Sequence, residues 1–293
     1  MTVQLTTSDL LARGTARLAR LLERPDLDAG VLLAFSLGIP RVRLKSHPEE
    51  ARTAQELQHY LELIERRAQG EPLAYITGVR GFWTLELRVT RDVLVPRPET
   101  ELLVERALVL CARADAQVLD LGTGCGAIAL ALAAERPAWQ LLGIDASAAA
   151  LAVAADNARR LGLAHVTFGH GSWFSGLGGR RFDLVVSNPP YVDARDPVLL
   201  DLAHEPRQAL TPGVDAMADL RTIIRGAPAQ LRPGGWLALE HGATQAGAVS
   251  RELVARGFGS VRSHRDLGGH ERVTEGQWPG DRDTHDGNTG SIS

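Results

Sequence analysis

A glycine-rich turn in the middle of the chain constrains the fold more than any other feature. A short apolar segment, residues 118–121, runs directly into a turn at 122–126 that contains three glycines, and an alanine- and leucine-rich helical pattern follows. Further apolar segments end at residue 145 and cover residues 166–168, 182–186 and 236–240, with helical stretches between them. Strands that alternate with helices predict an α/β fold with a parallel sheet.

The turn and the strand after it predict a nucleoside-binding site. Gly122, Gly124 and Gly126 let the backbone turn sharply and let a ligand approach the main chain. The helix that follows offers free N–H groups in its first turn. Asp145 ends the next strand about 20 residues later, where a carboxylate typically binds ribose hydroxyls.

Two cofactors fit this pattern. Gly122, Gly124 and Ala127 also match the dinucleotide fingerprint, so an NAD-dependent oxidoreductase is an open alternative. Asp120, at the end of the first strand, would face a cationic amino group or sulfonium, as in S-adenosylmethionine, more favourably than a pyrophosphate. If this carboxylate only caps the loop amides, it is compatible with either cofactor.

A second motif selects the reaction. The fourth strand runs into Asn188-Pro189-Pro190-Tyr191, at the sheet edge where parallel α/β proteins bind ligands. The prolines fix the backbone and leave their carbonyls free, and the Asn188 side chain supplies another acceptor for an –NH2 group. The Tyr191 ring can cover a planar amide or base.

These acceptors suit methyl transfer to a planar nitrogen. An amide nitrogen is a poor nucleophile because its lone pair is delocalised. Two acceptors on its hydrogens raise the electron density on nitrogen, and both hydrogen bonds strengthen as the nitrogen becomes positive. A sulfonium cofactor already carries an activated methyl group, so the chemistry needs no metal, and we predict no metal site.

The rest of the chain shows other patterns. Three amphipathic stretches in roughly the first 70 residues, the first capped by Ser8, predict a helical bundle. Residues 82–89 and 93–95, on either side of a turn, predict a β-hairpin. We therefore expect a helical domain (1–78), a hairpin linker (79–100), a ligand-binding domain (101–278) and a disordered polar tail (279–293).

Composition restricts the partners and the compartment. The formal net charge is −3, whereas a general nucleic-acid binder is usually basic. The chain has two cysteines, too few for a disulfide framework, and its longest strictly apolar run, residues 127–134, is too short to span a membrane. We therefore expect a cytoplasmic monomer that has no membrane partner and no direct nucleic-acid substrate.

With these motifs the sequence resembles the HemK/PrmC family of class I S-adenosylmethionine-dependent methyltransferases, which methylate N5 of a glutamine in peptide-chain release factors. The resemblance covers about residues 28–278 and includes the glycine turn and the Asn-Pro-Pro-Tyr motif. The other matching segments are residues 72–78, Phe82, 95–101, Asp145, 173–174, 205–206, 239–242 and 266–273. It implies a Rossmann-like class I methyltransferase sheet, a small N-terminal helical bundle and a β-hairpin linker between them.

The resemblance also implies roles for single residues. The residues expected to bind S-adenosylmethionine are Gly122, Thr123, Gly124, Cys125, Gly126, Asp145, Trp173 and Asn188. Asp145 would hold the ribose, Trp173 would lie beside the adenine, and the product cofactor would be S-adenosylhomocysteine. The residues expected to frame the substrate are Asn188, Pro189, Pro190 and Tyr191, with Asn188, Pro189 and Tyr191 as catalytic residues. The substrate would be the glutamine of the Gly-Gly-Gln loop of class 1 release factors, which the helical domain would help to dock.

Other functions stay open. Ribosomal-protein glutamine methyltransferases share the tetrapeptide, but they usually lack the Pro-Glu-Thr-Glu sequence found here at residues 98–101. DNA adenine and RNA guanine methyltransferases also use the tetrapeptide and usually add a basic surface. A non-catalytic module that only binds a partner would tend to lose a motif, and both motifs are intact here.

Overall fold

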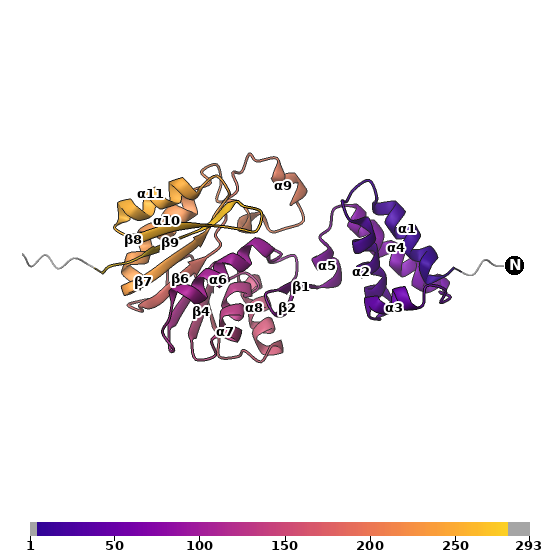
Figure 1. Ribbon diagram of the computed structural model, residues 1–293, viewed down its shortest axis with the longest axis horizontal. Coiled ribbons are helices and arrows are strands. Elements are labelled where there is room, and N and C mark those ends of the chain that lie inside the picture. Colours follow the sequence, from indigo (N-terminus) through magenta and orange to yellow (C-terminus); the bar gives the residue numbers. More distant parts are fainter. Residues whose placement is uncertain (1–4, 281–293) are drawn as a thin grey trace, which may run out of the picture. The chain divides into compact units, whose positions relative to one another are not determined.

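The computed structural model describes residues 5–280, which divide into two compact units on either side of the Val79–Arg80 bond (Figure 1). Each unit has its own hydrophobic core. No helix in this part of the chain is long and apolar enough to cross a membrane. The expected tail, 279–293, lies outside the described residues except for its first two, and the functional division into four segments stays a prediction.

The first unit consists of helices. They are α1 (Thr7–Leu18), α2 (Pro25–Leu37), α3 (Arg41–Ser46), α4 (Ala54–Ala68) and α5 (Leu73–Thr77). The predicted cap at Ser8 is wrong: Thr6 caps α1 in a capping box, in which its hydroxyl accepts the Asp9 N–H and the Asp9 carboxylate accepts the Thr6 N–H. The sequence did not predict the short helices α3 and α5.

The hairpin is present, but its strands differ from the prediction. β1 (Val79–Phe82) pairs with β2 (Leu85–Arg88) across a two-residue turn. The expected return strand at residues 93–95 is wrong. The N–H of Val95 donates to the Glu205 carboxylate, 3.0 Å away, rather than to a neighbouring strand. This segment is therefore a loop that Glu205 holds, and not a strand of the hairpin.

A seven-stranded sheet forms the centre of the second unit, with strand order β5-β4-β3-β6-β7-β9-β8. The strands are β3 (Gln117–Leu121), β4 (Gln140–Asp145), β5 (Thr167–His170), β6 (Phe182–Ser187), β7 (Leu231–Glu240), β8 (Gly259–Arg265) and β9 (Glu271–Gln277). The pairs from β5 to β7 are parallel, which confirms the expected sheet. β9 runs antiparallel to both of its neighbours. The sequence did not predict β8 and β9, because both are rich in polar residues.

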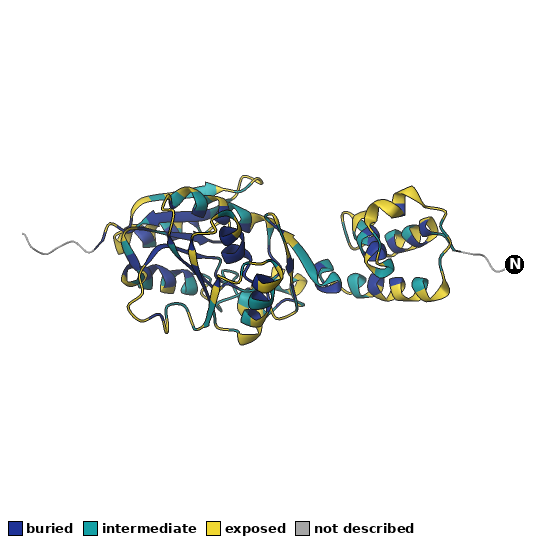
Figure 2. Cartoon of the chain, turned by 90° about the horizontal axis from the view of Figure 1, so that it is seen from below, coloured by how far each residue is buried: buried dark blue, intermediate teal, exposed yellow. Residues whose placement is uncertain are grey.

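Helices cover both faces of this sheet (Figure 1). They are α6 (Glu101–Leu110), α7 (Ala127–Glu135), α8 (Ala148–Arg160), α10 (Ala218–Gln230) and α11 (Ala246–Arg256). The short helix α9 (Val198–Asp201) lies in a loop away from the sheet, and 3-10 turns η1 (Pro98–Thr100) and η2 (Arg207–Ala209) complete the unit. α6 packs on α7, and α10 packs on α11. In Figure 2 the central strands are dark blue, because side chains on both of their faces are covered.

The strand register aligns the residues that matter for function. Leu121 of β3 pairs with Ile144 of β4 and with Ser187 of β6. Ser187 in turn pairs with Leu239 of β7. The carboxyl ends of four neighbouring strands therefore meet at one edge of the sheet, where open α/β sheets bind ligands. The residues that come next along these strands are Gly122, Asp145, Asn188 and Glu240.

Asn157 of α8 connects the hairpin to the glycine turn. Its side chain is fully buried. Its Oδ1 accepts the Arg88 N–H at 2.7 Å, and its Nδ2 donates to the carbonyls of Arg88 and Cys125 at 2.9 and 3.0 Å. One side chain thus bonds backbone groups of β2 and of the turn at the same time.

We expect Asn157→Ala to lower the free energy of unfolding by about 2 to 4 kcal/mol, because it leaves buried backbone groups without partners. Denaturant unfolding followed by tryptophan fluorescence measures this. Asp156→Ala is the matched control: it removes the neighbouring surface ion pairs with Arg88 and Arg159, which contribute little. Equal losses in the two variants would contradict the assignment.

Candidate functional site

Positive φ angles distinguish the turn after β3. They are 72° at Gly122, 56° at Gly124 and 85° at Gly126. A Cβ on Gly126 would lie 3.0 Å from the Leu130 side chain and 3.3 Å from Ala154, so this glycine lets α7 and α8 pack closely. A Cβ on Gly124 would meet no atom within 4 Å. The middle of the turn therefore faces open space, where a ligand can approach the backbone.

Asp145 ties this turn to the end of β4. Its Oδ2 accepts the Gly124 N–H at 2.9 Å, and its Oδ1 accepts the Ser147 N–H at 2.8 Å. Each carboxylate oxygen keeps a further lone pair for a ligand hydroxyl. The same side chain thus shapes the turn and presents acceptors beside it.

Asp120 does not face a ligand. Its side chain is fully buried, and its Oδ2 accepts the Thr123 hydroxyl at 2.7 Å. Burial raises the pKa of Asp120 to about 7, while the bond from Thr123 partly offsets that rise. The Asp120 Oδ1 receives no hydrogen bond in the described part of the chain, and Asp120 does not line the cavity beyond the strand ends. The expectation that Asp120 faces a cationic group is therefore wrong, and the contact that the structure gives it is with Thr123 of the turn.

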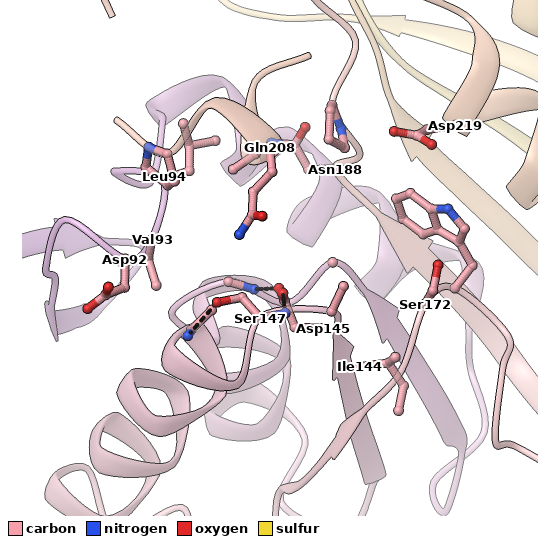
Figure 3. A pocket seen from close by; sticks show the side chains of 18 of the residues that line it. Asp92, Val93, Leu94, Ile144, Asp145, Ser147, Ser172, Asn188, Gln208 and Asp219 are labelled. Atoms are coloured by element: carbon pink, nitrogen blue, oxygen red, sulfur yellow. Dashed lines mark hydrogen bonds between the residues drawn. The ribbon is translucent and has the colours of Figure 1, made fainter. Parts of the chain in front are cut away.

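A cavity of about 300 Å³ opens beyond these strand ends (Figure 3). Its lining includes three aspartates, Asp92, Asp145 and Asp219, and contains no Lys, Arg or His among the described residues. Partial burial raises the pKa of Asp219. An acidic lining favours a cation, whereas the pyrophosphate of a dinucleotide would lack a charged partner. The cavity therefore argues against the NAD alternative.

The predicted site residues fall into two groups. Those that line the cavity are Gly122, Gly124, Asp145, Trp173, Asn188 and Pro190. Those that do not are Thr123, Cys125, Gly126, Pro189 and Tyr191. Thr123, Cys125, Gly126 and Pro189 are buried behind the lining. Direct binding by either group stays a prediction.

Asn188 and Trp173 lie on different parts of the wall. The Asn188 Nδ2 donates to the Thr100 hydroxyl oxygen at 3.1 Å, which leaves the Asn188 Oδ1 available as an acceptor. Trp173 has a φ of 49°, a conformation that is rare for a bulky residue and tends to mark functional sites. A Cβ on Gly122 would lie 3.8 Å from the Trp173 ring, so the indole borders the turn.

Sequence reasoning missed several lining residues, among them Asp92, Leu94, Gln208 and Asp219. The sequence places Asp92 in the expected hairpin turn and Leu94 in the expected return strand, whereas both belong to a loop at the cavity wall. Glu205 holds this loop, because its buried carboxylate accepts from the Val95 N–H and from the Arg97 guanidinium. The segment 205–206 stood out in the sequence, but nothing there indicated which residues it would contact.

Tyr191 extends behind the cavity toward β7. Its hydroxyl donates to Glu240 Oε1 at 3.3 Å, and its carbonyl accepts from Gln245 Nε2 at 3.2 Å. Burial raises the pKa of Glu240 to about 7, and the hydroxyls of Thr100 and Tyr191 partly offset that rise. The end of the Asn-Pro-Pro-Tyr motif is therefore anchored to the core.

Comparisons with known proteins agree with this geometry. Residues 9–78 match the PrmC N-terminal domain, and residues 98–218 match the methyltransferase small domain. A release factor glutamine methyltransferase of Xylella fastidiosa (strain Temecula1) is 48% identical over 274 residues, which cover 92% of this chain and 98% of the relative. The Pseudomonas aeruginosa enzyme of the same name is 50% identical over 254 residues, covering 86% of this chain and 92% of that enzyme.

The chain belongs to the release factor glutamine methyltransferase family. The resemblance inferred from the motifs is thereby confirmed. A methyltransferase from Pyrococcus furiosus has the same fold: its crystal structure matches with a TM-score of 0.53 at 18% identity and covers 74% of this chain and 98% of its own.

The methyl donor of this methyltransferase is S-adenosylmethionine. The cavity suits that molecule on three counts. Asp145 presents free lone pairs beside the turn, the Trp173 indole borders the same space, and the acidic lining is complementary to a sulfonium and an α-amino group. Gly122 and Gly124 leave the backbone open to the ligand.

We expect Asp145→Ala to weaken binding of S-adenosylhomocysteine by about 1 to 3 kcal/mol, because it removes charged acceptors and frees the turn. Calorimetric titration measures the affinity. Asp156→Ala is the control, since it removes a carboxylate that lies outside the lining and pairs with Arg88 and Arg159. An unchanged affinity in Asp145→Ala, or an equal loss in both variants, would show that the contact is misassigned.

Proposed function

We propose that this enzyme transfers a methyl group from S-adenosylmethionine to the side-chain N5 of the glutamine in the Gly-Gly-Gln loop of class 1 release factors, and so supports translation termination. One observation carries the proposal. Asn188, with a free amide oxygen, lies at the wall of the cavity that Asp145 and the glycine turn also line. The site therefore offers an amide acceptor beside the place of the methyl donor.

The residues act by binding and orienting the amide. S-adenosylmethionine supplies the activated methyl group. Asn188 Oδ1 and a carbonyl of the following prolines accept the two hydrogens of the glutamine amide and direct its lone pair toward the donor. As the nitrogen becomes positive, both hydrogen bonds strengthen, which stabilises the transition state more than the bound substrate. Pro190, which lines the cavity, would frame the glutamine directly, and Tyr191, which lies behind the cavity, would support that wall.

A segment near the site supports release factors over ribosomal protein as the substrate. The Pro-Glu-Thr-Glu sequence at residues 98–101 includes Thr100, which accepts a hydrogen bond from Asn188. The sequence feature that separates the two groups of enzymes therefore contacts the residue proposed to bind the glutamine. We assign the N-terminal helices, which match the PrmC N-terminal domain, to docking of the release factor.

We further propose that the enzyme works as a cytoplasmic monomer and takes no nucleic acid as its substrate. The lining of the cavity supports the last point, because its described residues include no basic side chain that would hold a phosphate.

The direct test is methyl transfer from labelled S-adenosylmethionine to a purified class 1 release factor. We expect a mass gain of one methyl group on the loop glutamine, and none in a release factor whose glutamine is replaced by alanine. If no transfer occurs while S-adenosylhomocysteine still binds, the proposed substrate is wrong, and ribosomal protein and RNA become the next substrates to assay.

We expect Asn188→Ala to lower kcat by about 10²- to 10³-fold, as loss of one preorganised group at a developing charge does. Affinity for S-adenosylhomocysteine should stay within about tenfold, because the main contacts of Asn188 tighten only in the transition state. Gln208→Ala, which removes an exposed carboxamide from the same cavity, should lower kcat far less. Unchanged turnover in Asn188→Ala would contradict the mechanism.

A further inference from the structure

A buried acid to which the proposed methyl transfer gives no role lies behind the Asn-Pro-Pro-Tyr motif. Glu240, the last residue of β7, is 1% exposed. Its Oε1 accepts the Tyr191 hydroxyl at 3.3 Å. Its Oε2 is buried and receives no hydrogen bond within the described part of the chain. A buried carboxylate oxygen without a partner is costly and needs an explanation.

The Thr100 hydroxyl bonds Asn188, whereas its bond to the unpartnered Glu240 Oε2 is an inference from the lone pairs and protons available, not a contact of the described structure. Asn188 Nδ2 donates to Thr100 Oγ1, so the hydroxyl proton of Thr100 is free to donate to another group. The Thr100 hydroxyl favours the ionised form of Glu240, as expected of a donor near a carboxylate. A carboxylate only accepts hydrogen bonds, so the chain of bonds can run in one direction, from Asn188 through Thr100 to Glu240.

We propose that Glu240 is a positioning residue for methyl transfer, which holds both ends of the Asn188–Tyr191 motif by accepting the hydroxyl protons of Thr100 and Tyr191. This inference rests on the proposed role of Asn188. The carboxylate orients Thr100 so that its oxygen faces the Asn188 –NH2 group. The Asn188 carboxamide is thereby fixed with its oxygen toward the substrate nitrogen.

The direction of these bonds has a chemical consequence. The terminal torsion of asparagine has two nearly equivalent orientations, which exchange oxygen and –NH2. If the Thr100 hydroxyl were free to donate to Asn188, the carboxamide could turn its –NH2 toward the substrate amide, which also presents –NH2. Two donors would then face each other. A buried acceptor behind Thr100 removes that orientation.

The charge of Glu240 acts in the same sense. Arg272 of β9 favours the ionised form, and Glu99 of η1 opposes it. A carboxylate that polarises Thr100 and Asn188 strengthens the Asn188 oxygen as an acceptor, because hydrogen bonds in a buried chain reinforce one another. The substrate nitrogen gains positive charge during transfer, so this effect grows toward the transition state.

The first test is Glu240→Gln, assayed at about pH 8, where a group with a pKa of about 7 is mostly ionised in the wild type. Glutamine keeps the shape but can donate to Thr100. We expect kcat to fall by about 10- to 100-fold, while KM for the release factor and affinity for S-adenosylhomocysteine change by less than about threefold. A kcat equal to that of wild type would overturn the proposal.

Glu275→Gln is the matched control. Glu275 is a second buried carboxylate of the same sheet, 2% exposed, and Arg106 binds it at 3.0 and 3.1 Å. Its replacement should lower the melting temperature and leave kcat within about twofold, because the ion pairs of Glu275 in the described part of the chain are with Arg106 and His264 and not with the motif. If both variants lower kcat equally, Glu240 has only a general structural role and the proposal fails.

A second pair of variants tests the connection itself. Thr100→Val removes the hydroxyl at nearly constant shape and should lower kcat about as much as Glu240→Gln, and Thr100→Ser should recover most of the loss. The double variant Thr100→Val/Glu240→Gln should be no slower than the slower single variant, because the two residues act through one chain of bonds. Multiplicative effects would overturn the proposal, as would a wild-type kcat in Thr100→Val, even if Glu240→Gln did not fold.

The wild-type assay distinguishes failure of the proposed function from failure of the proposed role of Glu240. If the wild-type enzyme methylates no release factor, the proposed function fails first. If the wild-type enzyme methylates the release factor and Glu240→Gln does so at the same rate, only the positioning role of Glu240 is wrong.

Discussion

The parallel pairing of β3 with both β4 and β6 is the interaction on which the site depends. It places Gly122, Asp145 and Asn188 at one level, although more than 60 residues separate the first from the last in the sequence. A slip of one residue in either pairing would turn the alternating side chains to the opposite face. Two carboxylates then bond the turn: Asp145 of β4 accepts the Gly124 N–H, and Asp120 of β3 accepts the Thr123 hydroxyl. The geometry for binding is thus a property of the sheet, and loops only complete it.

Charge then decides which nucleoside cofactor the edge can bind. The glycine pattern alone suits a dinucleotide equally well. Acidic side chains at the cavity favour S-adenosylmethionine over a dinucleotide, but Asp120, the acid that the sequence indicated, is not one of them. Asp120 is withdrawn into the core, whereas Asp92 and Asp219 come to the cavity wall from a loop and a helix that surround the strand ends. A cation gains from that wall, and an anion would lose on entering it.

These cases show how far the sequence could predict the site. Asp145 and Asn188 were predictable because Asp145 ends a buried strand and Asn188 directly follows one, so the strands set their places. Asp219, Thr100 and Glu240 were not, because their contacts form only when helix α10, turn η1 and strand β7 pack around those ends. The prediction of a strand at residues 93–95 failed for the same reason, a contact with a distant part of the chain. Its apolar pattern was read correctly, but Glu205, more than 100 residues away, takes the N–H that a strand neighbour would need.

The burial of Glu240 behind the Asn188–Tyr191 motif lowers the stability of the fold but orients the hydrogen bonds of the motif. An ionised carboxylate in the core costs free energy, and an apolar residue of similar size would often be more stable there. What an apolar residue cannot do is give direction to a chain of hydroxyl and amide groups that can each turn either way. The motif needs that direction because the substrate is itself a carboxamide, able to pair with Asn188 in either sense. Only the sense in which the substrate donates leaves its nitrogen lone pair free for the methyl group. A chain of bonds that ends on a pure acceptor selects that sense before the substrate arrives.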